Sequence, residues 1–299
     1  MGRALLFLLA TLPAASGLLQ ACSGVTVVSG GKVLLGHNND YRYAAEMLLR
    51  IVPPGDGLFG RVCISMETVP GWTPMGMTCI NDQGLAITHA NVPKAATPYD
   101  PDKPQFRHNF LEKIVAETTT VKQAVAMVKA YSLPAEHGAF VHLMLADASG
   151  DSAVIEWADG EVKVIPRQGS TQIMTNFLLS EPETAGGPQS RYARGARMLG
   201  ELKEPSVGAV VAVLKEISVH GRHQGEEVGT LESVVFDVTG GKVYLYSKRD
   251  FDHPLVLDMN EVFAKGARTE SYNSLFPHPV AFETGNRYED GPPAQTAGN

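Results

Sequence analysis

The chain has 299 residues, which is long enough for one large domain or two small ones with a sizeable core. Apolar residues make up 44% and charged residues 19% of the sequence, an ordinary balance for a globular protein. The formal charge is −7 and the sequence has no lysine or arginine run, which argues against a nucleic-acid-binding surface. Composition thus excludes nucleic acid as a partner without indicating a substrate.

The N-terminus has the order of a secretory signal peptide. Arg3 supplies a positive charge, residues 4–12 form an apolar run too short to span a bilayer, and Pro13 to Gly17 interrupt that run. No later stretch approaches the roughly 20 apolar residues of a membrane-spanning helix. We therefore expect residues 1–21 to be a signal peptide, with or without a short propeptide. We also expect an exported protein, periplasmic or extracellular, with no membrane span.

After the signal, the pattern alternates between hairpins and helices. Short runs bounded by Gly, Asn and Asp predict strands, and apolar residues at helical spacing predict helices, with Thr120 as one N-cap. Expected strands are 24–28, 32–36, 61–67, 76–80, 85–89, 141–147, 152–157, 162–166, 230–238 and 242–247, and expected helices are 106–117, 121–132, 191–201 and 206–219. This order favours sheets packed on each other with helices outside, in one domain over 22–276, followed by a loose tail over 277–299.

Three cysteines remain to be placed. Cys63 and Cys79 lie in two strands expected to be neighbours, so they either form a disulfide or pack as small buried side chains. Cys22 follows the expected signal directly, where cleavage would make it the first residue. An N-terminal cysteine holds a thiol with a pKa of about 8.5 and an α-amine with a pKa of about 7.7–8.0. One residue then supplies both a nucleophile and a general base.

A second interpretation of Cys22 competes with this one. Leu19-Gln-Ala-Cys22 resembles a bacterial lipobox, in which the cysteine is lipidated and anchors the protein to a membrane. Leu19 and Ala21 suit that motif, whereas Gln20 does not. Lipidation would block both the sulfur and the amine, so the two fates exclude each other.

From Cys22 the chain runs through an expected hairpin to Gly36-His-Asn-Asn-Asp40. This resembles the opening of the linear amide C–N hydrolases of the N-terminal-nucleophile (Ntn) superfamily. Members include bile salt hydrolases, penicillin V acylases, acid-ceramidase-like amidases and the acyl-CoA:6-aminopenicillanate acyltransferases. The resemblance implies an α+β fold, a four-layer αββα sandwich with two mainly antiparallel sheets. It also implies that Cys22 is the nucleophile and that Asp40 orients its amine.

Further motifs follow in the order of that family. Asn81-Asp-Gln-Gly-Leu runs on to Asn91-Val-Pro, Met174-Thr-Asn176 is similar to the Thr-Asn that follows a strand in the family, and Ser190-Arg191-Tyr begins an expected helix. The resemblance implies that Asn91 and Asn176 bind the oxyanion and that Arg191 lies close to the nucleophile. The segments 142–156 and 230–237 also fit the family, and we expect them to be fold-defining strands without a catalytic part.

One residue departs from the bile salt hydrolase pattern. Those enzymes have arginine where this chain has His37, and a neutral histidine stabilises a thiolate less well. The opening is more like that of the acyltransferase-related branch. The loops expected to line an acyl pocket are 58–60, 69–75 and 177–180.

The sequence therefore predicts an exported cysteine Ntn hydrolase that cleaves a linear, non-peptide amide through an acyl-thioester on Cys22. Its partner would be a small-molecule N-acyl amide, and we expect no cofactor and no metal, because His220 and His223 have no further ligand at suitable spacing. Two alternatives are an acyltransferase that passes the acyl group to an amine and a lipid-anchored, non-catalytic protein. The acyl group, the way Cys22 is exposed and the formation of a homo-oligomer stay open.

Overall fold

The computed structural model describes residues 22–66, 75–92, 99–106, 109–133, 141–182, 186–223 and 225–276. The strands of this part of the chain form two antiparallel sheets. The first sheet has the order β10 (Thr171–Met174), β1 (Ser23–Ser29), β2 (Lys32–Arg42), β12 (Glu226–Asp237), β13 (Lys242–Ser247) and β14 (Leu255–Asp258), and β11 (His220–His223) also pairs with β12. The second has the order β15 (Arg268–Ser271), β3 (Met47–Val52), β4 (Arg61–Met66), β5 (Met75–Asn81), β6 (Leu85–Asn91), β7 (Val141–Asp147), β8 (Ser152–Ala158) and β9 (Glu161–Pro166).

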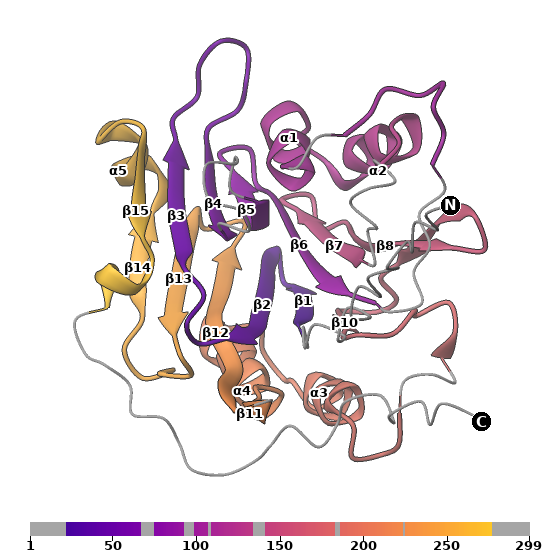
Figure 1. Cartoon of the computed structure of the whole chain (residues 1–299), viewed down its shortest axis with the longest axis vertical. Coiled ribbons are helices and arrows are strands. Elements are labelled where there is room, and N and C mark those ends of the chain that lie inside the picture. Colours follow the sequence, from indigo (N-terminus) through magenta and orange to yellow (C-terminus); the bar gives the residue numbers. More distant parts are fainter. Residues whose placement is uncertain are drawn as a thin grey trace, which may run out of the picture.

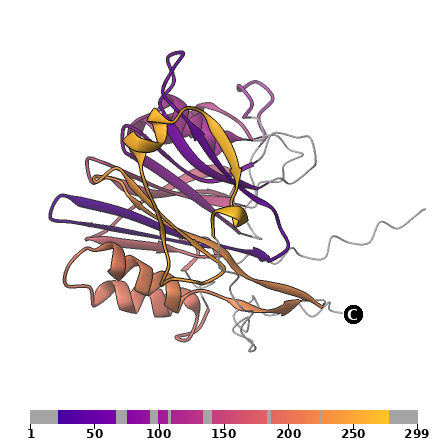
Figure 2. The same ribbon diagram turned by 90° about the vertical axis from the view of Figure 1, so that its left-hand side faces the viewer.

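The helices form the two outer layers. Helices α1 (Phe110–Glu117) and α2 (Val121–Ala130) cover the second sheet, and α3 (Arg191–Gly200) and α4 (Val207–Glu216) cover the first. A short helix, α5 (Met259–Ala264), follows β14. Figure 2 shows the layers from the side, with α3 and α4 below the β1–β2 hairpin and the second sheet above it. The predicted α+β sandwich is confirmed.

Three hydrophobic cores separate these layers, and strand alternation assigns side chains to them. In β2, Leu35 packs in the core between the two sheets, whereas its neighbour Leu34 packs against α3 and α4. In β7, Met144 faces the other sheet and Leu145 faces α1 and α2. The first sheet therefore has one face toward the second sheet and one toward helices, and the functional residues divide between these two faces.

The structure corrects several predicted boundaries. The predicted helix 106–117 begins only at Phe110, because the N–H of Phe106 donates to Ser132 O and Gln105 forms an extended bridge with Ser132. The predicted helix 121–132 ends at Ala130 for the same reason, while Thr120 caps its start as expected, its side chain accepting from Gln123 N. Strand β2 runs on to Arg42, six residues beyond the predicted end. The strands β3, β10, β11, β14 and β15 and the helix α5 were not predicted.

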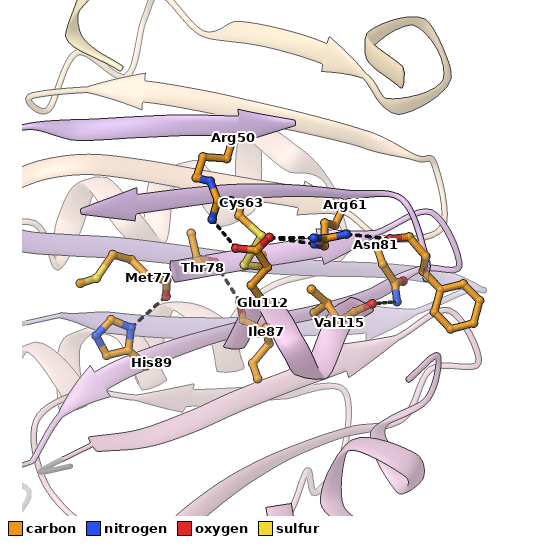
Figure 3. The surroundings of a disulfide bond; sticks show 12 residues. Arg50, Arg61, Cys63, Met77, Thr78, Asn81, Ile87, His89, Glu112 and Val115 are labelled. Carbon is orange, nitrogen blue, oxygen red and sulfur yellow. Dashed lines mark hydrogen bonds and ion pairs between the residues drawn. A yellow bond between two sulfur atoms is a disulfide. The ribbon is translucent and has the colours of Figure 1, made fainter. Parts of the chain in front are cut away.

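Cys63 and Cys79 form a disulfide between directly paired residues of β4 and β5, with Cα atoms 4.2 Å apart. This decides between the two interpretations left open by the sequence. Figure 3 shows its surroundings, where Glu112 of α1 forms ion pairs with Arg50 and Arg61. These ion pairs fasten α1 to the outer face of the second sheet, whereas the disulfide links β4 to β5 within that sheet. The predicted signal peptide and the predicted tail 277–299 lie outside the described residues.

Candidate active site

Cys22 lies immediately before β1, with its side chain fully buried between the two sheets. It is the free cysteine of the described chain, and its Sγ donates a hydrogen bond to Asn39 Oδ1 at 3.5 Å. The turn at Gly30 and Gly31, both with positive φ, returns β2 antiparallel to β1. This two-residue turn suits glycine, because left-handed backbone is costly for other residues. The hairpin therefore brings the end of β2 beside Cys22.

Burial, together with the nearby charges of Asp40 and Glu232, raises the pKa of the Cys22 thiol to about 12, against smaller lowerings by a hydrogen bond with the Asp40 backbone and by Arg191. Such a thiol is protonated at neutral pH and becomes nucleophilic only when a base takes its proton. In the full chain the nitrogen of Cys22 is bonded to Ala21, so no α-amine is available there. While that bond is intact, the thiol has no α-amine beside it to take its proton.

Asp40 follows Asn39 in β2 and points to the opposite face, toward the helix layer. Its Oδ2 accepts a hydrogen bond from Arg191 Nη1 at 3.1 Å, and its Oδ1 accepts one from Thr230 Oγ1 at 2.5 Å. Burial raises the pKa of Asp40 to about 6, while Arg191, Thr230 and His37 lower it. The carboxyl is therefore ionised above pH about 6 and holds a buried ion pair with Arg191.

Arg191 connects Asp40 with the two predicted oxyanion residues. It is the first residue of α3, which begins there because Ser190 accepts a hydrogen bond from Ala193 N as N-cap. Its Nη2 donates to Asn176 Oδ1 at 2.7 Å, and Asn176 Nδ2 donates to Asn91 O at 2.8 Å. Residues from three distant parts of the chain thus form one hydrogen-bonded chain next to the nucleophile. Asn91 takes part through its backbone oxygen.

A second buried pair lies on the inter-sheet face of the first sheet. His37 Nδ1 lies 3.7 Å from Glu232 Oε1, and both side chains are fully buried. His37 Nε2 lies 3.1 Å from His89 O of the opposite sheet. Within the described residues, neither Glu232 oxygen has a hydrogen-bond partner, and neither has His37 Nδ1. A buried carboxylate without hydrogen bonds is costly, so Glu232 is a strained charge beside the nucleophile.

Residues 27–251, more than half of the chain, match the family model of acyl-coenzyme A:6-aminopenicillanic acid acyl-transferase. The chain belongs to this acyl-transferase family. The family is Ntn hydrolase-like, so the predicted membership of the Ntn superfamily is confirmed. No curated protein matches the chain.

Solved structures with the same fold include Ntn enzymes of low sequence identity to this acyl-transferase family member. Two are variants of the conjugated bile acid hydrolase from Clostridium perfringens, with TM-scores of 0.64 and 0.63 and identities of 16% and 17%. Each comparison covers 84% of this chain and 96% of the hydrolase. Another is penicillin V acylase from Agrobacterium tumefaciens, with a TM-score of 0.60, 20% identity and coverage of 80% and 86%. These similarities establish the fold.

Sequence reasoning missed three residues of the site: Asn39, Thr230 and Glu232. Segment 230–237, which we expect to have no catalytic part, nevertheless borders the site, because Thr230 hydrogen-bonds Asp40 and the charge of Glu232 acts on the Cys22 thiol. A bulge between Thr230 and Glu232 turns their side chains to opposite faces of the sheet. The signal that could have found Thr230 and Glu232 is the cluster of polar residues, Ser233 included, in a buried and otherwise largely apolar strand.

The remaining expectations concern a metal site, a membrane span and the loops of an acyl pocket. In the described part of the chain, no group of three or more His, Cys, Asp or Glu side chains is arranged to hold a metal ion. Among the described helices, none is long and apolar enough to cross a bilayer. Of the expected pocket loops, Leu58 is exposed, Phe177 and Leu178 are buried, and segment 69–75 lies almost entirely outside the described residues.

Proposed function

We propose that the protein is an exported amide hydrolase that cleaves the linear amide bond of a small N-acyl substrate, with Cys22 as its N-terminal nucleophile. The observation that carries the proposal is the hydrogen-bonded chain from Asp40 through Arg191 to Asn176, beside a buried free cysteine. It joins the residues that the family resemblance assigns to catalysis. The similar structures include a bile acid hydrolase and a penicillin V acylase, which supports amide hydrolysis as the reaction class.

In the proposed mechanism, cleavage of the Ala21–Cys22 bond first frees the α-amine. The amine takes the thiol proton as Sγ attacks the substrate carbonyl carbon, and the oxyanion forms within reach of Asn176 and Asn91. The carbon–nitrogen bond then breaks, and the ammonium returns the proton to the leaving amine. Water attacks the thioester, the amine takes a proton from that water, and the acid leaves as Sγ regains its proton.

The high pKa of the Cys22 thiol fits this sequence of events. A thiol with a pKa of about 12 needs a base, and the α-amine is that base only after processing. The ammonium then also supplies a positive charge at the sulfur, which lowers the pKa of the thiol. Asp40 and Arg191 hold the α-amine and the oxyanion-binding asparagines in position relative to each other.

The burial of Cys22 counts against the lipoprotein alternative. The side chain has no exposed surface and packs in the core between the sheets. A diacylglyceryl group on Sγ would have to fit within that core or pull the start of β1 out of it. The disulfide between Cys63 and Cys79 supports export, because disulfides persist in oxidising compartments.

The test is hydrolysis of a panel of acyl amides: N-acyl amino acids, penicillin V, a glycine-conjugated bile acid and an N-acyl-homoserine lactone. Wild type should release the amine, and Cys22→Ala should lose activity to background. The matched control is the double variant Cys63→Ala/Cys79→Ala, which removes the other two cysteines and should retain turnover. Activity that survives in Cys22→Ala would overturn the mechanism.

Acyl transfer is the second candidate, because the matching family model describes an acyl-transferase. The acyl-thioester is common to both reactions, and the acceptor decides between them. If the protein is an acyltransferase, an added amine acceptor, such as 6-aminopenicillanic acid, should be acylated faster than the thioester is hydrolysed. If the free acid remains the main product at millimolar amine, the protein is a hydrolase.

A further inference from the structure

A second histidine–carboxylate pair lies behind Asn176. His142 of β7 and Glu156 of β8 are cross-strand neighbours, since the adjacent residues Leu143 and Ile155 pair directly. Both side chains are fully buried, and His142 Nδ1 lies 3.3 Å from Glu156 Oε1. The other ring nitrogen, Nε2, lies 2.6 Å from Thr175 O.

Both ring nitrogens of His142 therefore face acceptors. A backbone carbonyl and an ionised carboxylate have no proton to donate, so with Glu156 ionised both ring nitrogens carry a proton and the ring is an imidazolium. Glu156 is suited to the ionised form, because its two oxygens accept the N–H groups of Leu179 at 2.5 Å and Ser180 at 3.0 Å. Burial raises the pKa of Glu156, but the hydrogen bonds from His142 and these two N–H groups outweigh it and lower the pKa overall.

These contacts hold both sides of the segment that contains Asn176. His142 binds the carbonyl one residue before Asn176, and Glu156 binds the N–H groups three and four residues after it. Asn176 itself is held between Arg191 and the backbone of Asn91. A small displacement of this segment would move the amide away from both partners.

We propose that His142 and Glu156 form a buried imidazolium–carboxylate clamp that positions Asn176 for binding the oxyanion. Both are positioning residues, because they act through the segment 175–180 and touch no reacting atom. The role of Asn176 rests on the proposed function, whereas the charge state of the clamp does not. Sequence analysis assigned the strands of His142 and Glu156 to the fold alone.

The clamp makes activity depend on one proton. A neutral His142 has a single N–H for two acceptors, so it must release either Glu156 or Thr175. Two other groups act on the clamp electrostatically. His89 of β6 interacts with His142, and Lys163 of β9, which lies opposite Glu156 in the strand register, interacts with Glu156. A protonated His89 would disfavour the imidazolium. Raising the pH should therefore loosen Asn176 and lower kcat.

The charge state is measured directly by NMR of the full chain labelled with 15N-histidine. At pH 7, one of the nine histidines should show two protonated ring nitrogens bonded to acceptors, and His142→Gln should remove that signal. Glu156→Gln removes the counter-charge and should shift the same ring to the neutral pattern. A neutral His142 in wild type at pH 6–7 would overturn the clamp, whatever the activity of the protein.

Kinetics on the substrate found in the panel test the positioning role. Glu156→Gln should lower kcat by about 10- to 100-fold with KM nearly unchanged, and move the alkaline limb of kcat to lower pH. The matched control is Leu143→Ala, which removes buried contacts from the same strand on its helix-facing side and should leave kcat unchanged while the protein is folded. Unchanged kcat in folded Glu156→Gln overturns the positioning role. A wild type without turnover contradicts the proposed function alone, because the NMR result still decides the clamp.

Discussion

Within the described part of the chain, two buried histidine–glutamate pairs lie in the space between the sheets, and they differ in whether their polar atoms have hydrogen-bond partners. In the His142–Glu156 pair, both ring nitrogens and both carboxylate oxygens have partners. In the His37–Glu232 pair, His37 Nδ1 and Glu232 Oε1 lie 3.7 Å apart, and in the described residues neither carboxyl oxygen is hydrogen-bonded. The same two residue types thus hold a backbone segment in one place and leave a strained charge beside the nucleophile in the other.

This difference shows that burial of a charged pair does not by itself indicate its role. Removing one partner of a fully hydrogen-bonded pair is strongly destabilising, because the other charge is left buried without compensation. A pair without hydrogen bonds already bears that cost, and its field acts on whatever lies nearby. Here the neighbours are Cys22 and Asp40, and Glu232 raises the pKa of both.

Breaking the fully hydrogen-bonded His142–Glu156 pair should cause the largest change in the free energy of unfolding. Glu156→Leu leaves the His142 imidazolium without a counter-charge and two backbone N–H groups without acceptors. We expect the free energy of unfolding to fall by about 3–5 kcal/mol. Urea denaturation followed by circular dichroism measures this, and a loss below 1 kcal/mol would contradict the description of a fully satisfied pair.

Removing the carboxylate of Glu232 should raise the free energy of unfolding. Glu232→Leu replaces a carboxylate that lacks hydrogen bonds by an apolar side chain in an apolar core, so we expect the protein to gain about 1–3 kcal/mol. The same urea titration measures the change. A clear loss of stability would indicate that Glu232 has favourable interactions beyond its contact with His37.

The charge of Glu232 also predicts a change in thiol reactivity. Glu232→Gln keeps the size of the side chain and removes one of the charges that raise the pKa of Cys22, so the thiol should ionise more readily. Alkylation of Cys22 by iodoacetamide at pH 8, measured on the mature protein with a free α-amine, should accelerate a few-fold relative to mature wild type. Glu156→Gln serves as the matched control and should leave the rate unchanged, because Glu156 is not among the charges that act on this thiol. Equal rates in Glu232→Gln and wild type would refute the electrostatic coupling.

Asp40, on the opposite face of the strand that contains His37, makes the stability depend on pH. Its folded-state pKa of about 6 lies above its usual value of 3.8, so the folded state binds this proton more tightly. The contribution is fully present below pH about 4 and is lost as the pH rises through about 6. We therefore expect a Cys22→Ala chain that keeps residues 1–21 to lose stability over this range relative to the same chain with Asp40→Asn. Parallel stability curves between pH 4 and pH 7 would contradict this.

The sequence predicted most of the fold because its hairpins carry strong local signals. The turn at Gly30-Gly31 and the N-cap Thr120 are examples in which a short stretch determines the backbone. Strands β10 and β15 have four residues each, too few for alternation to be recognised, and their partners lie far away in the sequence. The start of α1 depended on a long-range contact between Phe106 and Ser132, which no local pattern encodes.

The candidate site was predictable only where a motif marked it. Cys22, Asp40, Asn176 and Arg191 stand in motifs shared with a family, and the structure brings the last three into one hydrogen-bonded chain. Asn39 was inside such a motif without an assigned role, and its contact with Cys22 requires knowledge of the hairpin register. The different roles of Glu156 and Glu232 depend on which backbone groups reach each carboxylate. That is a property of the packed sheets and cannot be read from either strand alone.

The central claim is that the substrate acyl group passes through Cys22. The most direct measurement is mass spectrometry of the mature protein, acid-quenched within milliseconds of mixing with the best substrate of the panel. The account predicts a chain that starts at an unmodified Cys22 and gains the mass of one acyl group on its N-terminal peptide, an adduct that Cys22→Ala never forms. A diacylglyceryl adduct on Cys22, or turnover with no acyl adduct on that peptide, would contradict it.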